Sequence, residues 1–303
     1  MAAICPVCSQ PGLPGEKFCE ECGQPLGAEL CAVCGAGAVD ADGYCGRCGV
    51  RQPSGRDHME IDHVVEHVAG PLRVAGVSDR GLRHSHNEDA MALTHVGGPG
   101  DDPVVVGVVC DGVSTSPRPE EASQTAADIG AAVLAKQLRE GIGPVEATGR
   151  AVRAAAQAVA GLAVSEYEAP ACTLVSAVVS AEHVTVGWVG DSRAYWLAGP
   201  GSALLTRDDA GPGHVLTAWL GADAGEVVPH VQIFAPEGPG VVLVCSDGLW
   251  NYYPDPVALA DAVPDAAADP LGAARTLVKL ALQAGGRDNI TVLVIPFAGR
   301  RRP

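Results

Sequence analysis

Acidic residues recur at the ends of the most apolar segments of this 303-residue sequence. Two of them stand in Asp-Gly pairs that follow apolar runs, in Val-Val-Cys-Asp-Gly and Val-Cys-Ser-Asp-Gly, and others lie in Asn-Glu-Asp, Gly-Asp-Ser-Arg and Asp-Asn-Ile. A single Asp-Gly is usually a turn. Carboxylates that converge at one edge of a sheet, however, repel one another unless hard divalent cations bind between them. The set therefore predicts an oxygen-rich site for Mg²⁺ or Mn²⁺. Its members are Glu88, Asp89, Asp111, Asp191, Asp247 and Asp288.

A second group of residues with metal-binding chemistry lies at the N-terminus. Eight of the eleven cysteines fall in the first 48 residues, as four Cys-x-x-Cys pairs, and the last two pairs repeat the first two at an offset of 26 residues. Zinc in structural sites takes four thiolates in a tetrahedron, so we predict two tandem zinc ribbons that hold two Zn²⁺. A redox dithiol set or a disulfide-bonded small fold is the alternative, and the pairs could also be shared between the repeats. The predicted ligands are Cys5, Cys8, Cys19, Cys22, Cys31, Cys34, Cys45 and Cys48.

The charge of the chain argues against a nucleic-acid partner. Its 36 Asp and Glu outnumber its 20 Lys and Arg, which gives a net charge of −16, and residues 1–50 alone carry −4. Binding of nucleic-acid phosphates needs clustered basic residues. We therefore expect the ribbons to dock or regulate a protein partner, or to be a passive structural cap. Because there is no membrane-length apolar run and no secretory signal, we expect a cytoplasmic protein without a membrane partner.

The elements that position the carboxylates must lie beyond residue 70. Apolar, β-rich runs alternate there with polar turns, and helical patterns arrive in pairs, over 120–140 and 145–164 and near 256–263 and 271–284. This order predicts an α+β fold in which a central antiparallel β-sandwich is flanked by helices, in α-β-β-α layers. We divide the chain into a double zinc ribbon (1–50), a linker (51–70), a catalytic domain (71–298) and a basic tail (299–303). The linker histidines are expected at the surface; they are His58, His63 and His67.

Five motifs in this order resemble those of the metal-dependent, type 2C (PPM) Ser/Thr protein phosphatases of bacterial type. They are Ser78-Asp-Arg-Gly-Leu-Arg-His-Ser-His-Asn-Glu-Asp89, Asp111-Gly112, Gly190-Asp-Ser-Arg193, Cys245-Ser-Asp-Gly-Leu249 and Gly286-Arg-Asp-Asn-Ile-Thr-Val292. The resemblance covers residues 72–297. It implies hydrolysis of phosphoserine and phosphothreonine in proteins by a hydroxide that two Mn²⁺ or Mg²⁺ ions activate, in opposition to bacterial Ser/Thr kinases.

The resemblance also implies a role for each motif carboxylate. Carried over by position, Asp111 would bridge both ions and would be the central catalytic ligand. Asp247 and Asp288 would bind one of the ions, and Glu88 with the carbonyl of Gly112 would bind the other.

Two further positions follow from the same resemblance, and one departs from it. Asp89 would hold metal-bound water, and Asp191 with Asp247 resembles a third metal site. The family's phosphate-binding arginine is replaced by His84, with Arg83 one residue earlier. Neighbouring side chains on a strand face opposite ways, so we favour His84, as an imidazolium, for the phosphate contact. The alternative is that both residues are structural.

These observations favour an active protein Ser/Thr phosphatase, because every aspartate expected at the metals is present. The alternative is a catalytically weak or inactive phosphatase fold that acts as a binding or regulatory module, which the histidine at position 84 motivates. A third hypothesis is that the ribbons recruit the phosphatase to a protein complex.

Overall fold

A computed structural model divides the chain into two units, Met1–Asp57 and His58–Pro303. It describes residues 5, 8, 10, 19–21, 31, 33–34, 44–52, 54–66, 70–98, 102–165 and 168–299. Cys22, His67 and the end of the basic tail, residues 300–303, lie outside the described residues. In the first unit, Arg51 is anchored by a two-pronged pair with Asp57, with both nitrogen–oxygen distances 2.6 Å.

The second unit contains two antiparallel sheets. The first has the strand order β1-β2-β11-β10-β7-β8 and the second the order β3-β4-β5-β6-β9. The strands of the first sheet are β1 His58–Val65, β2 Leu72–Asp79, β11 Ile290–Phe297, β10 Gly240–Cys245, β7 Arg193–Leu197 and β8 Ala203–Leu204. Those of the second are β3 Ala90–Val96, β4 Val104–Cys110, β5 Leu174–Val179, β6 Val184–Val189 and β9 His230–Phe234.

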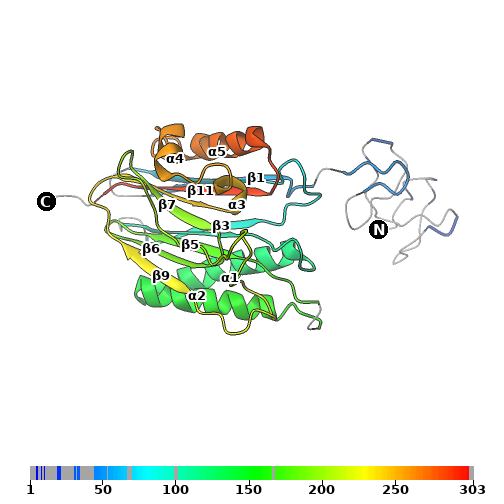
Figure 1. Cartoon of the computed structure of the whole chain (residues 1–303), viewed down its shortest axis with the longest axis horizontal. Coiled ribbons are helices and arrows are strands. Elements are labelled where there is room, and N and C mark those ends of the chain that lie inside the picture. The colour runs from blue at the N-terminus through cyan, green and yellow to red at the C-terminus, as the bar shows by residue number, and fades with distance from the viewer. Residues whose placement is uncertain are drawn as a thin grey trace. The chain divides into compact units, whose positions relative to one another are not determined.

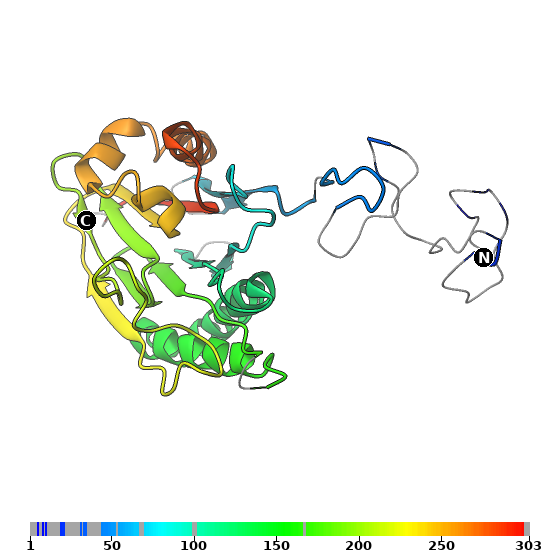
Figure 2. The same cartoon turned by 45° about the vertical axis from the view of Figure 1, so that its right-hand side comes forward.

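Helices cover the outer faces of both sheets, as Figure 1 shows. The helices α1 (Pro119–Arg139) and α2 (Pro144–Ala160) pack on the five-stranded sheet. The helices α3 (Asp247–Trp250), α4 (Pro256–Ala262) and α5 (Pro270–Ala284) pack on the six-stranded sheet. Figure 2 shows the same two helical layers on opposite sides of the sandwich. A third apolar cluster fills the space between the sheets, so the predicted α-β-β-α sandwich is confirmed.

The layering explains why the central strands are apolar throughout. Strands β10 and β11 are covered by helices on one face and by the other sheet on the opposite face, so nearly every residue of Gly-Val-Val-Leu-Val-Cys and Ile-Thr-Val-Leu-Val-Ile-Pro-Phe is buried. The helices begin with local signals. Asp269 caps α5 by accepting a hydrogen bond from the Gly272 N–H (3.0 Å), and Pro270 follows at the first helical position.

The expected linker over residues 51–70 is corrected by the structure from His58 onward. Residues 58–65 form β1, which pairs with β2 along its full length. Met59, Ile61, His63 and Val65 alternate with exposed residues, which is the pattern of an edge strand with one buried face. His63 is accordingly half-buried rather than a surface residue, and its Nε2 lies 3.2 Å from Nδ1 of His95 on β3.

Candidate active site

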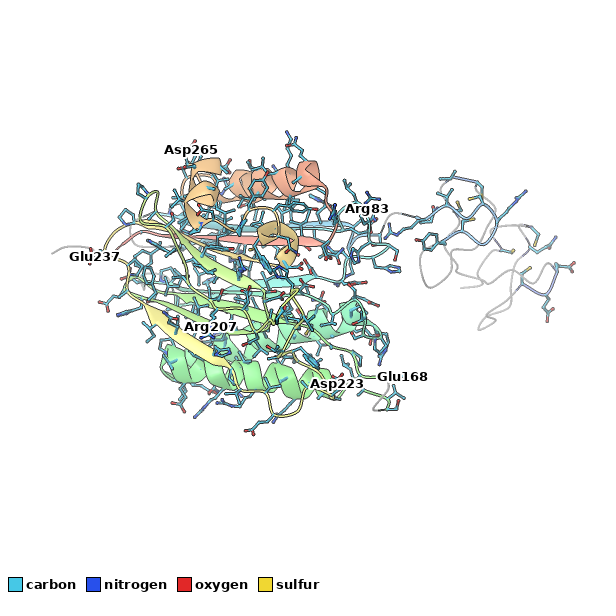
Figure 3. The ribbon with its side chains drawn as sticks, viewed as in Figure 1. Arg83, Glu168, Arg207, Asp223, Glu237 and Asp265 are labelled. Atoms are coloured by element: carbon cyan, nitrogen blue, oxygen red, sulfur yellow. The ribbon has the colours of Figure 1, made fainter. Side chains whose placement is uncertain are left out.

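Strand ends bring the predicted carboxylates to one end of the sandwich. Strand β4 ends immediately before Asp111-Gly112, and β10 ends one residue before Asp247-Gly248. Strands β3 and β11 begin immediately after Glu88-Asp89 and Asp288-Asn289. The antiparallel register pairs the first residue of β3 with the last of β4, so the end of one strand meets the beginning of the other. Arg83 marks this end of the unit in Figure 3.

Burial and mutual repulsion raise the pKa of four aspartates at this end. Burial first, and then the charges of the neighbouring aspartates, raise the pKa of Asp111 well above its ordinary range. Burial raises the pKa of Asp89 to about 7, and burial followed by the charge of Asp288 raises the pKa of Asp247 to about 8. Burial raises the pKa of Asp191 to about 6. The fold therefore holds several carboxyl groups where their negative charge is unfavourable.

This donor set fits hard divalent cations. Oδ1 of Asp247 is buried and has no hydrogen-bond partner within the described part of the chain. Among the described residues, no three carboxylates bring their oxygens within 4.8 Å of one another, so these side chains would have to move closer together to share one cation. Carboxylate and carbonyl oxygens are the ligands that Mg²⁺ and Mn²⁺ prefer. Positive charge placed here would relieve the repulsion that raises the aspartate pKa values.

Close backbone packing requires glycine at the second position of both Asp-Gly pairs. The Gly112 N–H donates to the Glu88 carbonyl (3.2 Å), and a Cβ at Gly112 would lie 2.7 Å from that carbonyl oxygen. A Cβ at Gly248 would overlap the carbonyl of Asn289. Each glycine thus lets the backbone beside one of the clustered aspartates contact the backbone beside another carboxylate.

His84, and not Arg83, lies among the carboxylates. Its Nε2 is 3.2 Å from Oδ1 of Asp288, and its Nδ1 is 3.8 Å from Oε2 of Glu88. The hydrogen bond with Glu88 is the largest cause of a raised His84 pKa. Arg83 is exposed. Arg80 donates to the His84 carbonyl and so fastens the loop that presents the imidazole.

Three polar residues of the site were missed by the sequence reasoning. Ser114 donates to Oε2 of Glu88 (2.5 Å), and Ser246 donates to Oδ2 of Asp89 (2.7 Å). The side-chain oxygen of Asn289 accepts from the Glu88 N–H (2.7 Å). Ser246 and Asn289 each directly adjoin a predicted metal ligand in sequence, which was a usable signal; Ser114 had none.

The turn that carries Asp191 is also fixed by its neighbours. Gly190 has a φ of +103°, and a side chain there would collide with Thr173. The Gly190 N–H donates to Asp209 (3.0 Å), which also contacts Nε2 of His230 (2.8 Å). Asp191 lies close enough to Asp111 and Asp247 to raise the pKa of both, so the structure groups it with the predicted centre.

In the first unit, the cysteines gather within each repeat. Ligand atoms of Cys31, Cys34, Cys45 and Cys48 lie within 4.8 Å of one another, and so do those of Cys5, Cys8 and Cys19. This grouping contradicts thiols shared between the repeats.

Backbone amides turn toward the thiols of the second repeat. The N–H groups of Val33 and Cys34 donate to the Cys31 sulfur, each at 3.4 Å, and the Cys34 hydrogen bond is the largest cause that lowers the Cys31 pKa to about 6. The N–H groups of Arg47 and Cys48 donate in the same way to Cys45. A compact thiolate quartet of this kind fits Zn²⁺.

Comparison with known proteins agrees with this arrangement. Residues 80–280 match the family described as protein phosphatase 2C, and residues 5–49 match the double zinc ribbon. The Ser/Thr protein phosphatase PstP of Mycobacterium tuberculosis is 28% identical over 249 residues, which are 74% of this chain and 44% of that protein. The chain thus spans less than half the length of this curated relative.

Solved structures show the same likeness. The crystal structure of PstP/Ppp from Mycobacterium tuberculosis has a TM-score of 0.62 at 26% identity and covers 75% of this chain and 99% of that one. The catalytic domain of PstP in complex with two manganese ions has a TM-score of 0.61 at 27% identity and covers 75% and 98% of the two chains.

The chain therefore belongs to the protein phosphatase 2C family. Its N-terminal unit is a double zinc ribbon domain, joined in one polypeptide to the phosphatase fold. None of the described helices combines the length and the apolar character needed to cross a membrane.

Proposed function

We propose that the second unit is a metal-dependent protein phosphatase that hydrolyses phosphoserine and phosphothreonine in proteins. The observation that carries this proposal is the group of aspartates with raised pKa values at one end of the sandwich. A fold that holds so many carboxyl groups together against their mutual repulsion is suited to binding cations. In a bacterial cell such an enzyme would oppose Ser/Thr kinases.

The cation ligands follow from the placement of the side chains. Asp111, at the centre of the repulsive group, would contact two Mn²⁺ or Mg²⁺ ions. Asp247 and Asp288 would hold one ion, and Glu88 with the Gly112 carbonyl would hold the other. When bound, the two ions would supply an acidified water as nucleophile and neutralise the charge of the phosphoryl oxygens.

The residues around these ligands orient them and water. Ser246 donates to one oxygen of Asp89 and so orients the carboxylate that would hold water at the centre. Asn289 fixes the backbone of Glu88. Asp191 and Asp247 together could take a third cation, since both are oxygen donors with raised pKa values.

We assign the phosphate contact to His84. Its imidazole faces the carboxylates of Asp288 and Glu88, which flank the centre. A cationic side chain at this place can donate a charge-assisted hydrogen bond to a phosphoryl oxygen once cations occupy the carboxylates. The exposed Arg83 is given no role in the contact.

The double zinc ribbon is proposed to bind two Zn²⁺ and to dock a protein partner. Residues 1–50 carry a net charge of −4 before the thiolates are counted, which disfavours nucleic acid as the partner.

The test is hydrolysis of p-nitrophenyl phosphate by the full chain with Mn²⁺, with Mg²⁺ and with neither. We expect metal-dependent turnover that Asp111→Asn abolishes. Glu237→Gln is a matched control, because it removes one exposed carboxylate from the other end of the unit (Figure 3). If the folded protein does not hydrolyse p-nitrophenyl phosphate in excess Mn²⁺, the proposed enzymatic activity is refuted. The alternative, a phosphatase-fold binding module, would then be favoured.

A further inference from the structure

A groove of about 500 Å³ opens beside the candidate active site. Ala163, Val164, Ser165, Ala222 and Asp223 line it. Its volume is within the ~300 to 1,000 Å³ that ligand sites take. Val164 is 75% exposed, so its apolar side chain is accessible to a ligand in the groove.

Backbone hydrogen bonds connect both walls of the groove to the loop that follows Asp111. The Val113 N–H donates to the Ala171 carbonyl (2.9 Å), so the chain that leaves one wall pairs with the Asp111 loop. Cys172 and Leu220 exchange two backbone hydrogen bonds, of 3.0 and 2.8 Å, which fastens the other wall to the same segment. A peptide whose phosphorylated residue lies at the metal centre can therefore reach the groove with a neighbouring side chain.

The polar end of the groove is a carboxylate held in place. The indole N–H of Trp219 donates to Oδ1 of Asp223 (2.9 Å), and no ion pair of Asp223 with another described residue is present. The described residues of the two flanking segments, 161–165, 168–172 and 219–229, contain three acidic residues, Glu168, Asp223 and Glu226, and neither Lys nor Arg. The guanidinium of Arg118, which donates to the Leu162 carbonyl (2.8 Å), is paired with Glu121. Figure 3 labels Glu168 and Asp223 at the same end of the unit.

We propose that this groove is a subsite for a basic side chain of the phosphoprotein substrate. The inference rests on the proposed phosphatase function and names a substrate class for it. A lysine or arginine combines an aliphatic stem with a cationic head. The stem would cover Val164, Ala163 and Ala222, and the head would pair with Asp223. A phosphoprotein with a basic residue near its phosphoserine or phosphothreonine is therefore the preferred substrate.

The experiment compares phosphothreonine peptides that carry arginine at successive flanking positions with the same peptides carrying alanine. For the wild-type full chain we expect arginine at one or more positions to lower KM by about two- to fivefold, the effect of one exposed charge pair. Asp223→Asn should erase this preference, and high salt should weaken it. Glu237→Gln, which removes the same charge from the opposite end of the unit, should retain it.

Turnover of p-nitrophenyl phosphate, which has no peptide to fill the groove, separates the two proposals. Its absence in the wild type would refute the phosphatase. If it is present and Asp223→Asn keeps the arginine preference, the subsite is refuted. If Glu237→Gln loses the preference as much as Asp223→Asn does, the subsite is also refuted and the preference reflects net charge alone. A Val164→Ser variant tests the apolar wall independently, and it should reduce the preference for arginine peptides while leaving alanine peptides unaffected.

Discussion

Without divalent cations, the second unit should lose stability as the pH rises from about 5 to about 8. The folded state holds Asp191, Asp89 and Asp247 with pKa values of about 6, 7 and 8, whereas an aspartate in the unfolded chain has a pKa of about 3.9. Between these values the folded protein binds more protons than the unfolded one, so the free energy of unfolding falls with increasing pH. Below about pH 4 both states are protonated and the penalty disappears.

The size of the effect can be worked from one residue. For Asp191 the difference is about two pKa units, which at about 1.4 kcal/mol per unit amounts to about 3 kcal/mol. This is a large part of the ~5 to 15 kcal/mol by which domains are stable. A cation that binds only the folded state raises the free energy of unfolding by about 2.7 kcal/mol when its concentration is 100 times its dissociation constant. Mn²⁺ at such a concentration should therefore offset an amount close to the contribution of Asp191 to the decline.

Tryptophan fluorescence during urea unfolding measures this unit alone, because all four tryptophans lie between residues 188 and 250. His58 and His84 also have raised pKa values and lose a stabilising charge in the same pH range. The dependence on Mn²⁺ separates the aspartates from His58, which lies outside the proposed ligand set. Asp111→Asn should flatten the decline, because it removes the carboxylate that the others repel, and should also remove the gain from Mn²⁺. Stability that stays level or rises from pH 5 to 8 in metal-free protein, or a Mn²⁺ gain that survives in Asp111→Asn, would refute the reasoning.

Two further outcomes are expected. His84→Ala should raise KM for p-nitrophenyl phosphate about tenfold in steady-state kinetics, because it loses one charge-assisted hydrogen bond. His84→Arg should keep KM within about twofold of the wild-type value. Equal KM values for the wild type and both variants would show that His84 does not contact the phosphate. Cys45→Ser and Cys8→Ser should each lower the zinc content from two ions per chain to one, measured by mass spectrometry of the metal, and the loss of both ions in either variant would show that the repeats share their thiols.

The layers of the fold and the end of the sandwich that carries the site could be predicted from the sequence for the same physical reason. Strands covered on both faces must be apolar over their whole length, and β10 and β11 are. A carboxylate cannot continue such a strand, so Asp111 and Asp247 mark where the strands end. Since antiparallel neighbours begin where their partners end, these aspartates lie together at one edge of the sandwich.

The edge strand β1 escaped prediction because its signal is of a different kind. Residues 58–65 alternate between inward-facing and exposed positions and contain two histidines and two acidic residues, Glu60 and Asp62. An edge strand needs only one apolar face, so it lacks the continuous run that identifies a central strand. Its pairing with β2, and the contact of His63 with His95, depend on residues about 10 to 30 positions away.

The contacts of Ser114 could not have been predicted for a related reason. Its hydroxyl meets Glu88, 26 residues earlier in the chain, only because β3 and β4 pair side by side. The groove beside the site has the same origin. The pairing of Cys172 with Leu220 brings residues 163–165 and 222–223 together, and no local sequence pattern predicts this pairing.

Position 84 shows how a local conformation decides between two basic neighbours. Alternation along a strand would place Arg83 and His84 on opposite faces but would not say which faces the site. The residues between β2 and β3 instead form turns, in which Arg80 holds the His84 carbonyl and Arg83 is left exposed. The imidazole then lies 3.2 Å from Asp288 and 3.8 Å from Glu88, which are the carboxylates proposed for different cations. A side chain placed between two such ligands faces whatever spans the two ions, and in the proposed reaction that is the phosphoryl group. In the proposed reaction, histidine in place of the family's arginine would therefore change the strength of the phosphate contact while keeping its place.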